Sequence, residues 1–253
     1  MLDDYKKHVD ERAELNIPPL PLDADQTSEL ISLLKEKNND PDYLLNLLKE
    51  RVPAGVDQAA YVKAAFLADI TTGNASSPYI SKIDAVEILG TMLGGYNVEP
   101  LIRCLEIEEL AETASHVLGR TLLIFDAFNE IFELSKKNKY AKKVIEEWAD
   151  AKWFTEKEDI KDQIKLTVFK VSGEINTDDL SPAPDAWSRP DIPLHALAMF
   201  KMPRTGLDDP LGTIEKLKEK GNPLVFVGDV VGTGSSRKSA TNSVLWHMGD
   251  EIP

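Results

Sequence analysis

A glycine-rich segment near the end of the sequence carries the strongest chemical signal. It reads GTGSSR over residues 232–237, after an apolar run at 223–227 and before an amphipathic stretch at 239–248. Glycines let a ligand approach the main chain closely, and the N–H groups that open a helix attract anions. Arg237 adds a guanidinium that can hold a carboxylate with two hydrogen bonds. The pattern predicts an anion site between a strand and a helix.

Two nucleotide-binding fingerprints fail in this segment. Arg237 stands where the third glycine of G-x-G-x-x-G would be, and no Gly-Lys pair precedes a serine or threonine. An anionic ligand that is not a nucleotide is therefore favoured. A plain connection between a strand and a capped helix remains the alternative.

A second polar cluster, NTDDLSPAPDAWSRP at residues 176–190, directly follows a predicted strand at 164–171. It carries two adjacent acids, Asp178 and Asp179, and one arginine, Arg189. Its prolines restrict the unfolded chain and fix the loop. Loops at strand ends often carry binding and catalytic residues, although aspartate and proline also favour ordinary surface turns.

The elements around these clusters predict two domains, an α-helical one and an α/β one. The alternating pattern at 164–171 and the apolar run at 223–227 predict strands, with short helices near 192–201 and 212–220 and another over 239–248. Before them, some eight apolar stripes at helical spacing predict a helical-pair solenoid or compact bundle. We place the domains at 1–158 and 163–253.

Composition excludes several classes of protein and site. The chain has 43 acidic and 29 basic residues, a net charge of −14, and most of the acidic excess lies in residues 1–162. Such a surface argues against DNA and anionic membranes as partners. The single cysteine, Cys104, excludes an internal disulfide or a cysteine-ligated cluster built from this chain alone, and no histidine has a second ligand at metal spacing. The sequence has no secretory signal and no run of about 18 apolar residues, so a cytoplasmic location is predicted.

Together the two motifs resemble the mobile swivel domain of the aconitase superfamily. NTDDLSPA at 176–183 and GTGSSR at 232–237 are similar to that family's T-D-H-[IL]-S-P-A and G-x-G-S-S-R patterns. Asp179 in place of the histidine, the PDAWSR continuation and the preceding helical region resemble the bacterial aconitase B branch. There, a HEAT-like helical domain and then the swivel domain come first, so the resemblance covers essentially the whole chain.

The resemblance implies an activity and roles for particular residues. Aconitases, enzymes of the tricarboxylic acid cycle, interconvert citrate and isocitrate through cis-aconitate, and the B branch also handles 2-methylisocitrate. A [4Fe–4S] cluster held by three cysteines acts as the Lewis acid. By motif position, Ser235 would be the base that removes the carbon-bound proton. The implied substrate-binding residues are Arg189, Ser235, Ser236 and Arg237, and the implied supporting residues are Thr177, Asp178 and Ser181.

The same resemblance raises expectations about completeness and partners. The chain lacks the cluster cysteines and ends just after the helix that follows the serine loop. We therefore expect a C-terminally incomplete swivel domain that alone binds no cluster and shows no hydratase activity. The resemblance implies a homodimer through the helical domain and mRNA binding by the apo form, although the acidic excess argues against RNA. Two alternatives stay open: a swivel-type small subunit of a split hydro-lyase, and a helical module for protein or RNA interaction.

Overall fold

The described chain forms two compact units, an α-helical one and an α/β one, which confirms the predicted α + α/β class. The computed structural model describes residues 2–15, 18–121, 127–156, 162–186 and 195–248. One unit is Leu22–Asp159, and the other combines Leu2–Pro21 with Ile160–Pro253. Helix α1 (Leu2–Glu14) is thus grouped with the second unit. The predicted domains, 1–158 and 163–253, did not include this grouping, and their limits remain a prediction.

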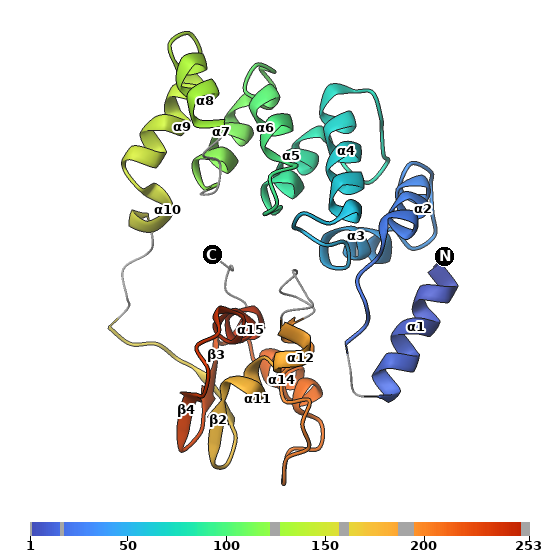
Figure 1. Cartoon of the computed structure of the whole chain (residues 1–253), viewed down its shortest axis with the longest axis vertical. Helices are drawn as coiled ribbons and strands as arrows, with labels where there is room; N and C mark the ends of the chain where they lie inside the picture. Colours follow the sequence, from blue (N-terminus) through green and yellow to red (C-terminus); the bar gives the residue numbers. More distant parts are fainter. Residues whose placement is uncertain (1, 16–17, 122–126, 157–161, 187–194, 249–253) are drawn as a thin grey trace. The chain divides into compact units, whose positions relative to one another are not determined.

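The first unit is a stack of helix pairs. Neighbours along the chain pack as α2 with α3, α4 with α5, α6 with α7 and α8 with α9, and α2–α4, α5–α7 and α7–α9 contacts join successive pairs. Figure 1 shows these helices as a row. The HEAT-like assignment itself stays a prediction. The helices are α2 (Ala24–Leu34), α3 (Pro41–Glu50), α4 (Gln58–Thr72), α5 (Lys82–Gly90), α6 (Val98–Cys104), α7 (Ala111–Gly119), α8 (Phe128–Ser135), α9 (Lys139–Ala149) and α10 (Lys152–Thr155).

Polar residues at the helix ends explain where the helices of this unit begin and stop. Asp40 caps α3 ahead of Pro41, which fits the preference for proline in the first turn of a helix. Ser81 and Asp84 form a reciprocal capping box on α5, and the hydroxyl of Ser81 holds the pKa of the Asp84 carboxyl below its ordinary value. Gly73 closes α4 in the left-handed conformation, with φ of +81°. One of the apolar stripes that predict the helices of this unit starts at residue 122, so it lies partly outside the described residues, and α8 begins at Phe128.

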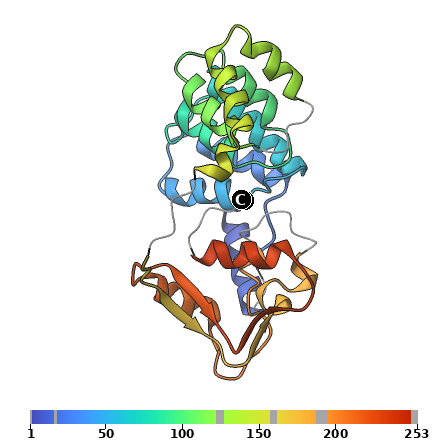
Figure 2. The ribbon, with the colours of Figure 1, turned by 90° about the vertical axis from the view of Figure 1, so that its left-hand side faces the viewer.

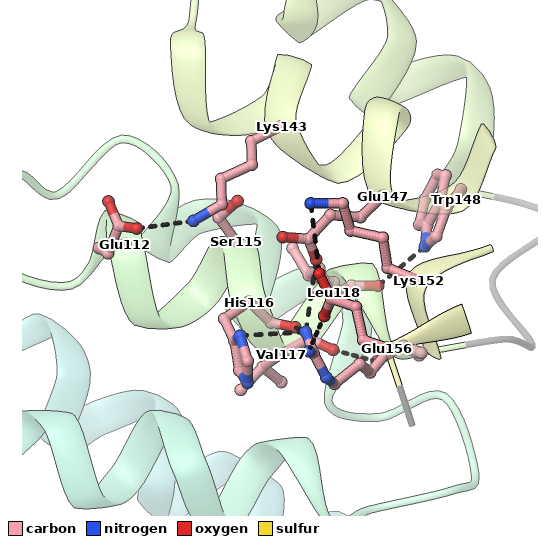
Figure 3. A network of polar contacts seen from close by, with 12 residues as sticks. Glu112, Ser115, His116, Val117, Leu118, Lys143, Glu147, Trp148, Lys152 and Glu156 are labelled. Carbon is pink, nitrogen blue, oxygen red and sulfur yellow. Dashed lines mark hydrogen bonds and ion pairs between the residues drawn. The ribbon is translucent and has the colours of Figure 1, made fainter. Parts of the chain in front are cut away.

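Side-chain contacts pin the end of α7 to α9 and to the turn after α10 (Figure 3). The indole N–H of Trp148 donates to the Leu118 carbonyl at 3.0 Å. Arg120 lies 3.5 Å from Glu147 and 2.9 Å from Glu156. Glu147 is buried, so its carboxylate depends on this partner. The helix pairs are therefore joined by polar contacts as well as by the leucine-rich core.

The second unit contains two pairs of parallel strands and the helices that follow them. Strand β1 pairs with β3, with Thr167 opposite Leu224, and β2 pairs with β4, with Glu174 opposite Val230. Figures 1 and 2 show β2 and β4 side by side. The elements are β1 (Thr167–Lys170), β2 (Glu174–Asn176), α11 (Thr177–Leu180), α12 (Ala183–Ala186), α14 (Pro210–Lys218), β3 (Leu224–Val227), β4 (Val230–Thr233) and α15 (Lys238–Met248).

In this unit, most of the elements predicted from the sequence are confirmed, and some are not. The strands at 164–171 and 223–227 and the helices near 212–220 and 239–248 are confirmed as β1, β3, α14 and α15. Of the helix expected near 192–201, residues 192–194 lie outside the description, and the rest is mostly turn. Two expectations were wrong. The segment between the strand at 223–227 and the helix at 239–248 was expected to be turn, but residues 230–233 form β4. The polar cluster was expected to be a loop, but it contains the last residue of β2 and the short helices α11 and α12.

Two turns hold the strand pairs in register. The Asp229 N–H donates to the Gly173 carbonyl at 2.8 Å, and the Gly173 N–H donates to the Asp229 carboxylate at 3.2 Å. A Cβ at Gly228 would lie 2.9 Å from the Gly173 oxygen, so the backbones touch directly. Beneath them, Phe169 packs edge-on against Phe200 and Phe226. The carboxyl ends of β2 and β4 therefore reach the same edge.

His247 anchors the far end of α15 in the core of this unit. The side chain is buried, and its Nε2 lies 2.9 Å from the Ala196 carbonyl oxygen. Nδ1 is buried with no hydrogen-bond partner among the described residues. Burial lowers the pKa of His247, while the contact with the Ala196 carbonyl opposes this shift. The folded unit therefore favours the neutral ring.

We expect the melting temperature to fall as pH drops below about 6.5, the ordinary histidine pKa. The unfolded chain binds a proton at His247 at higher pH than the folded chain does, so the stability present above that pKa is lost below it. Substitution His247→Gln should flatten this part of the pH profile measured by thermal melts, and His116→Gln, at an exposed histidine, should not. An unchanged slope in His247→Gln would contradict the assignment. Titration of Asp84, whose pKa is lowered, affects the stability only at more acidic pH and does not contribute near pH 6.5.

No helix in the described parts of the chain has both the length and the apolar character needed to cross a bilayer.

Candidate functional site

Helix α11 starts directly at the end of β2 and is fixed by a capping box and an ion pair. The Asn176 side chain accepts from the N–H groups of Asp178 and Asp179 at 2.9 and 3.0 Å. In return, the Asp179 carboxylate accepts from the Asn176 N–H at 2.9 Å, which completes a capping box. Asp179 also forms an ion pair with Arg204 at 2.9 Å. The single turn of α11 thus has a defined position at the strand end.

The glycine-rich segment leaves β4 beside α11. Gly234 has φ of +96°, a conformation that suits glycine, and a Cβ built on it would lie 2.8 Å from Thr177 Oγ1. The Thr177 hydroxyl is buried and has no hydrogen-bond partner among the described residues. Parallel pairing of β2 with β4 explains the meeting, because both strands end at this edge. The two motifs found in the sequence are therefore in contact.

Arg237 joins the two motifs by hydrogen bonds. Its Nη1 donates to the Ser181 carbonyl at 2.9 Å and to the Thr177 carbonyl at 3.3 Å, and it forms an ion pair with Asp178 Oδ1. A second link runs from the Ser181 hydroxyl to the Ser239 hydroxyl at 2.9 Å. The structure thus brings together Arg237 and all three of the predicted supporting residues, Thr177, Asp178 and Ser181.

The two predicted serines lie on the exposed loop between β4 and α15. Ser235 and Ser236 are both exposed, and neither hydroxyl has a hydrogen bond to another described residue. Helix α15 begins at Lys238, so Ser235 and Ser236 lie three and two residues before its first residue. The first N–H groups of a helix have no intrahelical acceptor, and the helix dipole favours negative charge there. This arrangement can hold an anion or stabilise a developing alkoxide.

Arg189, the other predicted carboxylate-binding residue, lies outside the described residues, and its role stays a prediction. Sequence reasoning missed Arg204 and Ser239, which support α11 and the start of α15. Neither residue belongs to a spacing pattern that indicates such a role. The adjacent acids Asp178 and Asp179 were visible, but their division between two arginines was not.

The residues present do not fit an iron–sulfur cluster. Such a cluster needs several cysteine thiolates, and the chain has one cysteine, Cys104, in the helical unit. That thiol is buried, and burial raises its pKa, which disfavours the thiolate that a metal requires. Among the described residues, no group of three histidine, cysteine or acidic side chains could hold a metal ion.

Substitution Gly234→Ala should disrupt the contact between the two motifs. It adds a Cβ at 2.8 Å from Thr177 Oγ1 and strains a positive φ, so we expect a loss of about 2 to 3 kcal/mol in the free energy of unfolding. Gly232→Ala is the matched control, because Gly232 also has positive φ but no atom within 4 Å of the added Cβ. Urea unfolding should show a loss of only about 1 kcal/mol there.

The same comparison has an internal check. Thr177→Ala removes the hydroxyl that the new methyl group would meet, so the double variant should recover most of the difference between the two glycine substitutions. Equal losses for Gly234→Ala and Gly232→Ala would show that backbone strain, rather than contact between the motifs, sets the cost.

Comparison with known proteins matches both parts of the chain to one group of enzymes. Residues 4–154 match the family model described as the aconitate B N-terminal domain, and residues 166–253 match the model described as the aconitate hydratase 2 N-terminus. The aconitate hydratase B of Pseudomonas aeruginosa is 57% identical over 262 residues, and that of Escherichia coli is 56% identical over 262 residues. The Helicobacter pylori protein of the same name is 50% identical over 254 residues.

These matches cover the whole chain but only part of the relatives. Each alignment includes 100% of this chain, which spans about 30% of the length of each of these three relatives. The first family model alone covers more than half of the chain, and the second covers residues 166–253, which include both motifs that Arg237 joins. The chain therefore belongs to the aconitate hydratase B family.

Proposed function

We propose that this chain supplies one side of an aconitate hydratase active site. The reaction is a hydro-lyase reaction that interconverts citrate and isocitrate through cis-aconitate, with dehydration of 2-methylisocitrate as a related activity. Ser235 acts as the base, while Ser236, Arg237 and Arg189 bind the substrate. Thr177, Asp178 and Ser181 support them. The observation that supports this proposal most strongly is that Arg237, from the glycine-rich motif, contacts three oxygens of the polar cluster at 176–190.

Carboxylate binding follows from the chemistry of Arg237. A guanidinium offers five N–H donors in a planar fork that matches a carboxylate, and it keeps its charge at neutral pH. Its side chain is 19% exposed, so the charge is largely enclosed yet reachable. A tricarboxylate needs more than one such group, and Arg189 is the second arginine of the proposal.

Proton removal is the role proposed for the Ser235 hydroxyl. A serine is a weak base unless its anion is stabilised, because its ordinary pKa lies far above neutral. The position of Ser235 ahead of α15 and two residues before Arg237 provides positive potential for an alkoxide at Oγ. Oγ would then take the carbon-bound proton of the substrate and return it in the reverse direction. Ser236, also exposed, would donate a hydrogen bond to a substrate oxygen.

The residues of this chain do not account for the iron–sulfur cofactor that the family resemblance implies, nor for its implied partners. This chain has no set of ligands for a [4Fe–4S] cluster, so any cluster must be held by other polypeptide, and no step is derived through it. Self-association through the helical unit, mRNA binding by the apo form and a cytoplasmic location stay predictions. The alternative of a small subunit in a split hydro-lyase differs only in whether the remaining residues are on a separate chain.

A chimera tests the proposal. This chain would replace the matching stretch of the Escherichia coli aconitate hydratase B, with which it is 56% identical. If the proposal holds, the purified chimera converts isocitrate to cis-aconitate with a kcat within about tenfold of the parent enzyme. A folded, cluster-loaded chimera without turnover would refute it. Comparing a fusion with co-expression of two separate chains also tests the split-enzyme alternative.

A further inference from the structure

The guanidinium of Arg237 is held on one side only. All of its hydrogen bonds to described residues use Nη1, which contacts the carbonyls of Thr177 and Ser181 and the carboxylate of Asp178. The two carbonyl oxygens belong to α11 and to the residue that ends it. One nitrogen is thus enclosed by three oxygens from a single short segment.

The other edge of the guanidinium remains available. Nε and Nη2 have no hydrogen-bond partner among the described residues, and these two nitrogens form the side-on fork that binds a carboxylate with two parallel hydrogen bonds. Three acceptors on Nη1 limit rotation of the group about its side-chain bonds. The orientation of the free fork is therefore set before any ligand arrives, which reduces the ordering cost of binding.

Asp178 is the charged member of this three-oxygen set and the one that a substitution can remove. Its side chain is 62% exposed, whereas the Arg237 side chain is 19% exposed, so the carboxylate is the more solvent-accessible partner of the pair. Its own position is fixed because α11 is capped by Asn176 and tied to Arg204 through Asp179. The carboxylate therefore projects from a capped helical turn toward a mostly enclosed guanidinium.

We infer that Asp178 is a positioning residue, which anchors Nη1 of Arg237 so that the Nε–Nη2 edge binds one carboxylate of the substrate. The inference rests on the proposed function, since it needs a carboxylate ligand. The opposite role makes a different prediction. If Asp178 merely competed with the substrate for Arg237, removal of its charge would strengthen the binding of any anion.

The test uses the full chain and three variants. Asp178→Asn keeps an oxygen acceptor without the charge, and Asp178→Ala removes both. Glu219→Ala removes an exposed acid elsewhere in the same unit and serves as the control. NMR of the arginine side chains measures how freely the Arg237 guanidinium rotates, and titration with citrate followed by NMR gives the dissociation constant.

The inference predicts slow rotation of Arg237 in the unsubstituted chain, in Asp178→Asn and in Glu219→Ala, and fast rotation in Asp178→Ala. Citrate should bind Asp178→Ala about tenfold more weakly than the unsubstituted chain, and Asp178→Asn within about threefold of it. Tighter binding by both Asp178 variants would overturn the inference and show competition, while leaving the proposed function intact. Absence of any citrate effect on Ser235 and Arg237 in the unsubstituted chain would instead count against the proposed function itself, whatever the rotation.

Discussion

Substitution Ser235→Ala in the chimera with the Escherichia coli relative is expected to lower kcat by about 10²- to 10⁴-fold, the usual contribution of a general base. The substitution removes the only atom of this side chain that can accept the substrate proton. Ser235 is exposed and makes no hydrogen bond to another described residue, so its loss should leave the fold and the thermal melt unchanged. The loss would therefore be one of chemistry rather than of stability.

The controls separate the hydroxyl's chemistry from a general effect of removing a serine. Ser32→Ala removes an exposed hydroxyl from α2, where it bonds only to the carbonyl one turn earlier at 3.0 Å, and should leave kcat unchanged. The measurement is the rate of cis-aconitate formation, monitored by ultraviolet absorbance at saturating isocitrate. A kcat for Ser235→Ala within twofold of the unsubstituted chimera would exclude Ser235 as the base.

The sequence predicted the separate elements of this site better than the contacts between them. The order of strand, glycine-rich segment and helix around Ser235 could be predicted because the apolar run at 223–227 and the stripe at 239–248 are clear local signals. The contact between Arg237 and Asp178 depends on pairing of β2 with β4, which are three and four residues long. No longer alternating or apolar run surrounds either of these strands, unlike β1 and β3, and β4 is largely exposed.

The supporting contacts show why tertiary neighbours escape local reasoning. Arg204 reaches Asp179 across 25 residues of sequence, and nothing in the chain around Arg204 indicates an acidic partner. The same holds for α1, because no local pattern in its sequence indicates its grouping with the α/β unit. The helix caps were easier, because a cap acts within a few residues of itself; Asp40 and Pro41 are the clearest case.

The Gly94-Gly95 pair illustrates the same limit inside the helical unit. The sequence shows two glycines after an apolar stripe and predicts a break there, but it does not distinguish their roles. In the structure, a Cβ on Gly94 would lie 2.1 Å from the carbonyl oxygen of Gly55 and 2.8 Å from the Val56 nitrogen. Gly95 has φ of +93°, and no atom lies within 4 Å of its added Cβ. One glycine allows close backbone packing and the other allows a turn.

We therefore expect Gly94→Ala to lower the free energy of unfolding by about 3 kcal/mol or more, because the Cβ is fixed to the backbone and the atoms that it meets are main chain, so neither can rotate away. The adjacent hydrogen bond, from the Leu93 N–H to the Ala54 carbonyl at 2.7 Å, would have to lengthen as the segments part. Urea unfolding followed by circular dichroism measures the loss.

Gly95→Ala is the matched control for this prediction. Its cost should be about 1 to 2 kcal/mol, the strain of a left-handed residue with a side chain and without any steric contact. A smaller loss for Gly94→Ala than for Gly95→Ala would show that the 54–56 segment yields easily to the methyl group. A larger one would show that close backbone contact between this segment and Gly94 stabilises the helical unit, which no pattern in the sequence reveals.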